Sequence, residues 1–268
     1  EYYGRAVAFD PGNPQLLERA TLANLSLGDI PHAVALADQL SEQGFSSQIG
    51  HMAQIAELSR TENYDDLIER IEGRTAIGPL VDGLVAAWSE PGRGDMSAAL
   101  IEFDKVAEEN GLAAFAAYHR AMALASVGDF EGAEAIFETG NAGSMQLTRR
   151  AVMARSEILS QIDRQDDAVA MIDEGFPPPR DPALEEMRQA LIEGESLPFT
   201  YVNNARDGIA EVFYTLAGAL SNEANDDFTL LYSRIAEYLR PDHVGAILLS
   251  ANLLENLGQH DLAVAAYK

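Results

Sequence analysis

The chain has 268 residues, 47% of them hydrophobic, and its 43 acidic and 18 basic side chains give a formal net charge of -25. That charge repels nucleic-acid phosphates and anionic lipid headgroups, so it argues against nucleic acids and membrane surfaces as partners. The absence of cysteine excludes disulfides, thiolate catalysis and cysteine-ligated metal. The longest apolar stretches, such as 77–88, are interrupted by Asp82 and are too short to cross a bilayer, so we expect no membrane insertion.

A short turn phrase, Gly-Asp-x-x-x-Ala, recurs at the spacing of a helix pair. Copies begin at Gly28, Gly94, Gly128 and, with Gln in place of Asp, at Gly258. The second and third copies lie 34 residues apart, and degenerate copies at 62–67 and 163–168 continue this period. A fixed period near 34 predicts an array of helix-turn-helix units. The aspartate of each turn is expected to cap the second helix.

In chain order, residues 1–12 look like the end of a truncated repeat, and 13–175 should form five helix pairs. The expected pairs lie within 13–44, 48–72, 80–110, 113–138 and 145–175, with breaks at Gly73, around Pro91-Gly92-Arg93-Gly94 and in the loop after 138. Residues 176–204 are irregular, because one helix at 182–192 is followed by a stretch without helical pattern. There, apolar side chains of 197–201 should cover the core that a missing second helix leaves exposed.

Regular pattern returns at Ala205, with the next turn near Ala224, so 205–268 should hold two more pairs. Their helices are expected at 205–221, 227–239, 244–257 and 261–268, the last one truncated. Since both ends fall inside a repeat, we expect the chain to be a segment of a longer array.

These residues resemble the tetratricopeptide repeat (TPR) family. The residues that match its pattern include Ala121, Gly128, Phe130, Ala133, Phe137, Phe213, Ala217, Ala236 and Pro241. The match covers nearly all of the chain except about 176–204. Stretches 117–121 and 238–242 are also similar to long alphaproteobacterial arrays, which implies a soluble bacterial protein of the cytoplasm or periplasm.

The resemblance implies an all-α fold: a right-handed α-α superhelix of about seven helix pairs. It also implies that the first helices form a concave groove that binds a peptide or protein segment without catalysis. The groove candidates are Met52, Leu84, Trp88, Tyr118, Met122, Arg150, Met153 and Tyr214. Leu84 with Trp88, and Tyr118 with Met122, repeat an i, i+4 spacing one unit apart, as an apolar stripe for a partner would. The same residues would serve equally well to pack adjacent repeats against each other.

No motif in the chain indicates catalysis or a cofactor. The five histidines, His32, His51, His119, His243 and His260, have no metal-ligand spacing, and His119 is expected to face a neighbouring helix. Residues 222–227 are interpreted as a helix cap, not a calcium loop. Arg149, Arg150 and Arg155 form the densest basic group; they either pair with neighbouring acids or receive an acidic stretch of a partner.

The sequence therefore predicts a non-catalytic scaffold that has no metal or cofactor and binds a protein or peptide of basic or apolar character. One alternative is a structural or self-associating spacer, a homo-oligomer whose groove stays empty. A second is an enzyme whose site lies in the irregular region, near 195–204.

Overall fold

The computed structural model describes residues 2–72, 76–140, 142–221 and 225–267. These residues form sixteen α-helices, one 3-10 helix and no strand, which confirms the all-α prediction. The helices are α1 (Tyr2–Phe9), α2 (Pro14–Leu27), α3 (Ile30–Glu42), α4 (Gln48–Arg60), α5 (Tyr64–Ile71), α6 (Pro79–Gly92), α7 (Met96–Glu108), α8 (Ala113–Ser126), α9 (Phe130–Glu138), η1 (Gly143–Leu147), α10 (Arg149–Gln161), α11 (Gln165–Gly175), α12 (Pro182–Ile192), α13 (Ala205–Leu220), α14 (Asp226–Leu239), α15 (Val244–Asn256) and α16 (His260–Ala266). The expected break at Gly73, the loop residue Asn141 and the turn at 222–224 lie outside the described residues.

The recurring turn phrase joins the two helices of a pair as predicted. Its aspartates Asp29, Asp95 and Asp129 each accept a hydrogen bond from the backbone N–H three residues later. The glycine before each aspartate has a φ between 78° and 87°, a left-handed conformation that disfavours residues with a Cβ. Glycine therefore ends one helix and aspartate begins the next.

Two helix boundaries differ from the prediction. Helix α6 runs through Pro91 to Gly92, because in the last turn a proline removes only one backbone donor, and Arg93 N–H still reaches the carbonyls of Ser89 and Glu90. At the fifth pair, 143–147 form η1, and α10 begins at Arg149 with Thr148 as its N-cap. In the described ranges, no helix combines the length and apolar character that spanning a membrane requires.

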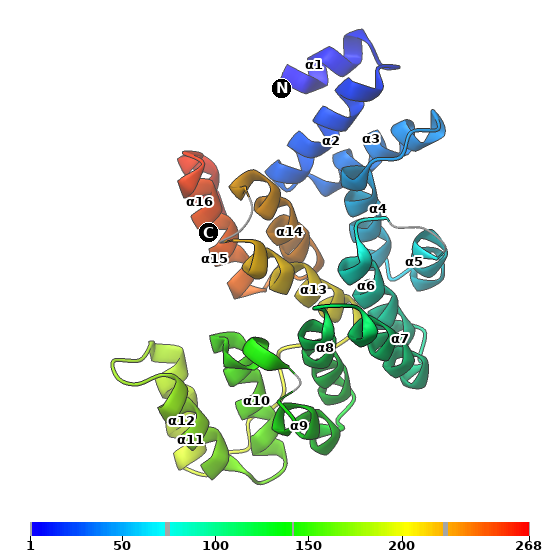
Figure 1. Cartoon of the computed structure of the whole chain (residues 1–268). Coiled ribbons are helices and arrows are strands. Elements are labelled where there is room, and N and C mark those ends of the chain that lie inside the picture. The colour runs from blue at the N-terminus through cyan, green and yellow to red at the C-terminus, as the bar shows by residue number, and fades with distance from the viewer. Residues whose placement is uncertain (1, 73–75, 141, 222–224, 268) are drawn as a thin grey trace.

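Helices α2 to α9 follow one another in space as they do in sequence, each packed on the next, along a curve (Figure 1). The inside of this curve is not open. Helix α13 packs along α6 and also touches α8 and α4, while α14 packs on α2 and α4. Figure 1 shows both helices inside the curve, with α15 and α16 on the far side of α14.

This arrangement differs from the expected superhelix with a free groove, and the reason lies in α14. Its residues 229–236 are all buried, so the helix is enclosed on every side. Such a helix needs neighbours all round, and α2, α4, α13 and α15 provide them. We call α2–α9 together with α13–α16 the block. One continuous apolar core runs from Leu25 on α2 to Ala246 on α15, and a small separate core of Leu230, Leu253, Leu254 and Ala263 holds α16.

Helices α10–α12, which we call the arm, build a second and smaller core. One face of α10 adds Ala151, Ala154 and Ile158 to the core of the block. The other face packs with α11 and α12 around Ile172 and Leu184. The fifth predicted helix pair therefore contributes to the main core only through one face of α10, while α11 packs in the smaller core.

Residues 194–204, which we call the strap, connect the arm to α13 without helical structure. Leu197 packs on the core of the arm, Phe199 on the core of the block, and Tyr201 on both. The prediction that 197–201 cover exposed core is confirmed. Ser160 and Gln161 of α10 hold the strap by hydrogen bonds to the backbone of Leu197.

Candidate functional site

The groove candidates on the first helices are buried under the chain's own C-terminal helices. Met52, Leu84, Trp88, Tyr118 and Met122 are at most 1% exposed. A Cβ built on Gly208 of α13 would lie 2.2 Å from the ring of Trp88, so α13 approaches α6 as closely as only a glycine allows. In this structure a partner has no access to Met52, Leu84, Trp88 and Met122, while Tyr118 is equally buried but borders a cavity.

Trp88 begins a polar chain that crosses from α6 to α13. Its indole N–H donates to His119 Nδ1 over 3.2 Å. The proton of His119 therefore lies on Nε2, which donates to Thr215 Oγ1 over 3.1 Å. Burial lowers the pKa of His119 to about 4, so the ring stays neutral. His119 thus faces a neighbouring helix, as predicted.

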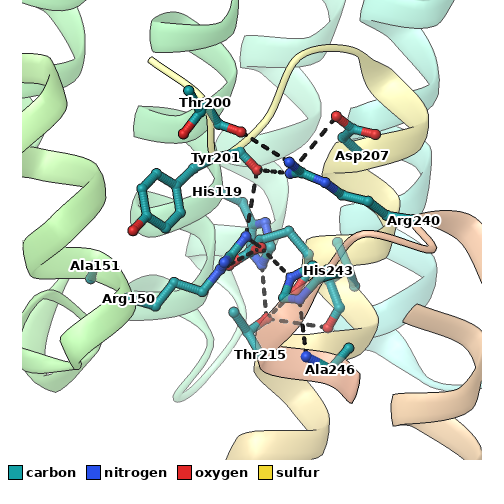
Figure 2. A network of polar contacts seen from close by, with 12 residues as sticks. His119, Arg150, Ala151, Thr200, Tyr201, Asp207, Thr215, Arg240, His243 and Ala246 are labelled. Carbon is teal, nitrogen blue, oxygen red and sulfur yellow. Dashed lines mark hydrogen bonds and ion pairs between the residues drawn. The ribbon is translucent and has the colours of Figure 1, made fainter. Parts of the chain in front are cut away.

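Glu211 on α13 is the centre of a buried polar network, and Figure 2 labels two of its partners, Arg150 and His243. Its carboxylate accepts hydrogen bonds from the Tyr118 hydroxyl at 2.8 Å, Arg150 Nε at 2.7 Å and His243 Nε2 at 3.2 Å. Burial alone would raise the pKa of Glu211, but the charge of Arg150 and the bond from His243 hold it well below its usual range. The other ring nitrogen of His243, Nδ1, accepts from Ala246 N–H and caps α15. This buried carboxylate ties α8, α10 and α15 to α13.

Arg150 lies between two tyrosine rings. Its guanidinium carbon is 4.7 Å from the centre of the Tyr201 ring and 5.3 Å from that of Tyr214, within range of cation–π attraction. Arg240, at the end of α14, donates to the carbonyls of Tyr201 and Thr200 (Figure 2). The strap is therefore held by Arg150 through the Tyr201 ring and by Arg240 through two backbone carbonyls.

A cleft remains between the arm and the C-terminal helices, formed by two cavities of about 380 and 570 Å³. Both cavities include Arg149, Arg150 and Tyr214 in their walls. The smaller also has Met153, Val244 and Leu248, and the larger Phe115, Met145 and Tyr118. Of the eight groove candidates, the structure brings Tyr118, Arg150, Met153 and Tyr214 to this cleft, and it places Met52, Leu84, Trp88 and Met122 in the core.

Of the two alternatives for the arginine group, the structure shows pairing with acids of the same chain. Arg149 binds Asp181, Arg150 binds Glu211 and Arg155 binds Glu134, each with a contact of 2.6 Å. The last pair joins α10 to α9.

Glu157 of α10 holds the strap from the arm side. It accepts hydrogen bonds from the backbone N–H of Thr200 at 2.7 Å and from its hydroxyl at 2.9 Å. Burial raises the pKa of Glu157 to about 7, since removal from water disfavours the charged form more than these bonds favour it.

Sequence reasoning missed Glu211, His243, Tyr201 and Arg240 as members of one site. A signal existed for Glu211, because it is a charged residue among the buried positions of α13, Ile209, Ala210, Val212 and Phe213. A carboxylate at such a position needs a buried cation as partner. The partner, Arg150, lies 61 residues away, so no local pattern could connect them.

Within the described ranges, no group of three or more His, Cys, Asp or Glu side chains is placed to hold a metal ion. The chain matches no protein-family model, and no curated protein matches it. The resemblance to TPR proteins therefore depends on the sequence residues quoted above alone.

Proposed function

We propose that this chain is a non-catalytic protein-interaction module of the TPR type, which binds a segment of a partner in the cleft between the arm and the C-terminal helices. The observation that carries this proposal is the burial of the inner wall beneath α13 and α14. That burial leaves the cleft as an open surface lined by the groove candidates Arg150, Met153 and Tyr214, with the buried Tyr118 at its border.

The shape of the cleft supports a chain segment as its occupant. Its two cavities share Arg149, Arg150 and Tyr214, and each has further apolar side chains in its wall. A peptide that runs past this polar middle would place a side chain in each cavity, a common way in which grooves recognise extended segments.

The state of the nearest ionisable groups supports binding rather than catalysis. His243 uses one ring nitrogen to cap α15 and the other to bind Glu211. Glu211 in turn accepts from three side chains. A general base must direct an available lone pair at its substrate, and these two groups already direct theirs at the protein.

The test is selection of peptides from a random dodecapeptide library on the full chain, followed by measurement of their affinities. We expect peptides with Kd in the micromolar range that bind Leu248→Asp at least tenfold more weakly. The matched control is Ile101→Asp on α7, because Leu248 is 52% and Ile101 58% exposed, and its affinities should not change. Failure to select any peptide, or equal binding to Leu248→Asp, would contradict the proposal.

A further inference from the structure

The cleft differs in charge from the rest of the molecule. Arg149, Arg150 and Arg240 line its two cavities, against the carboxylates of Asp242 and Glu211. In a chain of net charge -25, a wall with more cations than anions is exceptional. Since the Debye length at physiological salt is about 8 Å, a bound segment responds to these nearby side chains more than to distant surface acids.

Among these arginines, Arg149 is the one free to exchange its partner. Arg150 is bound to a carboxylate that is 1% exposed, and Arg240 supports two strap carbonyls. Arg149, in contrast, is 48% exposed, and its partner Asp181 is 39% exposed. The pair is bidentate, since Nε and Nη2 of Arg149 donate to the two oxygens of Asp181. Because both side chains remain open to water, an incoming carboxylate that offers the same two acceptors can replace Asp181.

Aliphatic surface lies in the same cavity as Arg149. Val244 and Leu248, one turn apart on α15, are among the most exposed large apolar side chains of the described residues. Met153 of α10 contributes to the same wall. An aliphatic side chain of a ligand would remove this surface from water, a gain of roughly 25 cal/mol per Å² buried.

We infer that the cleft recognises a protein segment in which a carboxylate stands close to an aliphatic residue. The carboxylate binds Arg149 in place of Asp181, and the aliphatic side chain covers Val244 and Leu248. This inference rests on the proposed function and specifies the chemistry of the partner, which is acidic and aliphatic instead of basic. The net negative charge of the chain attracts a basic partner at long range. In the cleft, however, a lysine of that partner would be repelled by Arg149.

The experiment compares three pools of nine-residue peptides, randomised over Leu and Ser together with Glu, Gln or Lys, for binding to the full chain in 150 mM salt. We expect the Glu pool to bind at least tenfold more tightly than the Gln pool, and the Lys pool to bind most weakly. Arg149→Gln should weaken the binding of the Glu pool at least fivefold. Its matched control is Arg93→Gln on the convex α6–α7 turn, since Arg93 is 44% exposed and also ion-paired, and this change should have no effect.

A second variant gives a gain of affinity that misfolding cannot imitate. Asp181 caps α12 by accepting a hydrogen bond from Leu184 N–H, and asparagine is an equally good cap. Asp181→Asn therefore preserves the helix but releases Arg149, and we expect the Glu pool to bind two- to fivefold more tightly.

The outcomes separate the two proposals. Equal binding of the Glu and Gln pools, or no gain from Asp181→Asn, overturns the carboxylate inference; if Leu248→Asp still weakens binding, the cleft remains a peptide site. Absence of binding by all three pools and by the selected dodecapeptides contradicts both.

Discussion

The block and the arm are built from the same kind of helix pair, yet they are held together differently. In the block, α13 and α14 fill the curve of the earlier helices, and one apolar core runs through nearly all of it. In the arm, α11 and α12 share a small core with one face of α10. Helix α10, η1, the strap and a few ion pairs connect the two regions among the described residues. A repeat pattern therefore specifies the helix pair, whereas the stability of each pair depends on what covers it.

Ion pairs of similar exposure serve both regions. In the pair Arg150–Glu211 the side chains are 18% and 1% exposed, and in Arg155–Glu134 they are 20% and 3% exposed. Their surroundings differ, because Glu211 also accepts from two buried side chains, whereas the further contact of Glu134 is the partly exposed Arg164. Both pairs join α10 of the arm to the block, so substitutions at the two glutamates compare a fully enclosed contact between the regions with a more open one.

The largest effect is expected for Glu211→Gln. Removal of this charge leaves Arg150 without its counter-ion and weakens the bonds from Tyr118 and His243, which should cost about 3–5 kcal/mol of unfolding free energy. Urea unfolding measures this loss. Glu134→Gln is the control; we expect a clearly smaller loss, with faster amide hydrogen exchange restricted to α10–α12. Equal losses would mean that block and arm unfold as one unit.

The next largest effect on stability is expected for alanine substitutions at two glycines of α13. In Gly208→Ala the new methyl group would meet the Trp88 ring, so α13 and α6 must separate, at a cost of about 1–3 kcal/mol. Gly218→Ala, in the same helix, meets nothing within 4 Å and should stabilise by up to about 1 kcal/mol through helix propensity. Thermal unfolding of both variants checks the opposite signs. A neutral Gly208→Ala would mean that the contact between α13 and the array is loose.

The block should lose stability in acid. His119 has a pKa of about 4 in the fold and about 6.5 when unfolded, so the unfolded chain takes up the proton first as the pH falls. The contribution of His119 to the free energy of unfolding is complete above pH 6.5 and is lost as the pH falls towards 4. At pH 5, roughly 1–2 kcal/mol of this free energy is lost. Urea unfolding at pH 7 and pH 5 measures the change. His119→Gln, which cannot titrate, should show a smaller difference between the two pH values.

The arm should respond to pH in the opposite direction, with the smallest effect. Glu157 has a pKa of about 7 in the fold, above its ordinary value of 4.5, so its contribution is complete below pH 4.5 and is lost as the pH rises through 7. Amide exchange in α11 and α12, corrected for intrinsic rates, should show opening increased on the order of tenfold between pH 5.5 and pH 7.5. Glu157→Gln, which keeps an acceptor for Thr200, should remove this dependence. An unchanged pH response in the variant would show that another group controls the arm.

Much of the local structure could be predicted because it depends on neighbours in sequence. The glycine–aspartate turns, the helix pairs and the covering role of 197–201 follow from spacing or residue type. The acids that Arg149, Arg150 and Arg155 bind lie 32, 61 and 21 positions away, so the sequence left their pairing as one of two alternatives. Helix ends were less predictable, as α6 shows, because a proline in a last turn costs little. Met52, Leu84, Trp88 and Met122 were predicted to lie on an open wall. The structure buries them, because α13 and α14 cover that wall.

The sequence by itself determined that this chain folds into paired helices, since glycine, aspartate and the apolar period act within one or two turns. Only the tertiary structure decided that α13 and α14 occupy the inside of the curve and that Glu211 meets Arg150, Tyr118 and His243. The physical reason is that burial and charge compensation join residues 32 to 93 positions apart in this network. No local sequence pattern indicates which of many apolar faces a distant helix will cover.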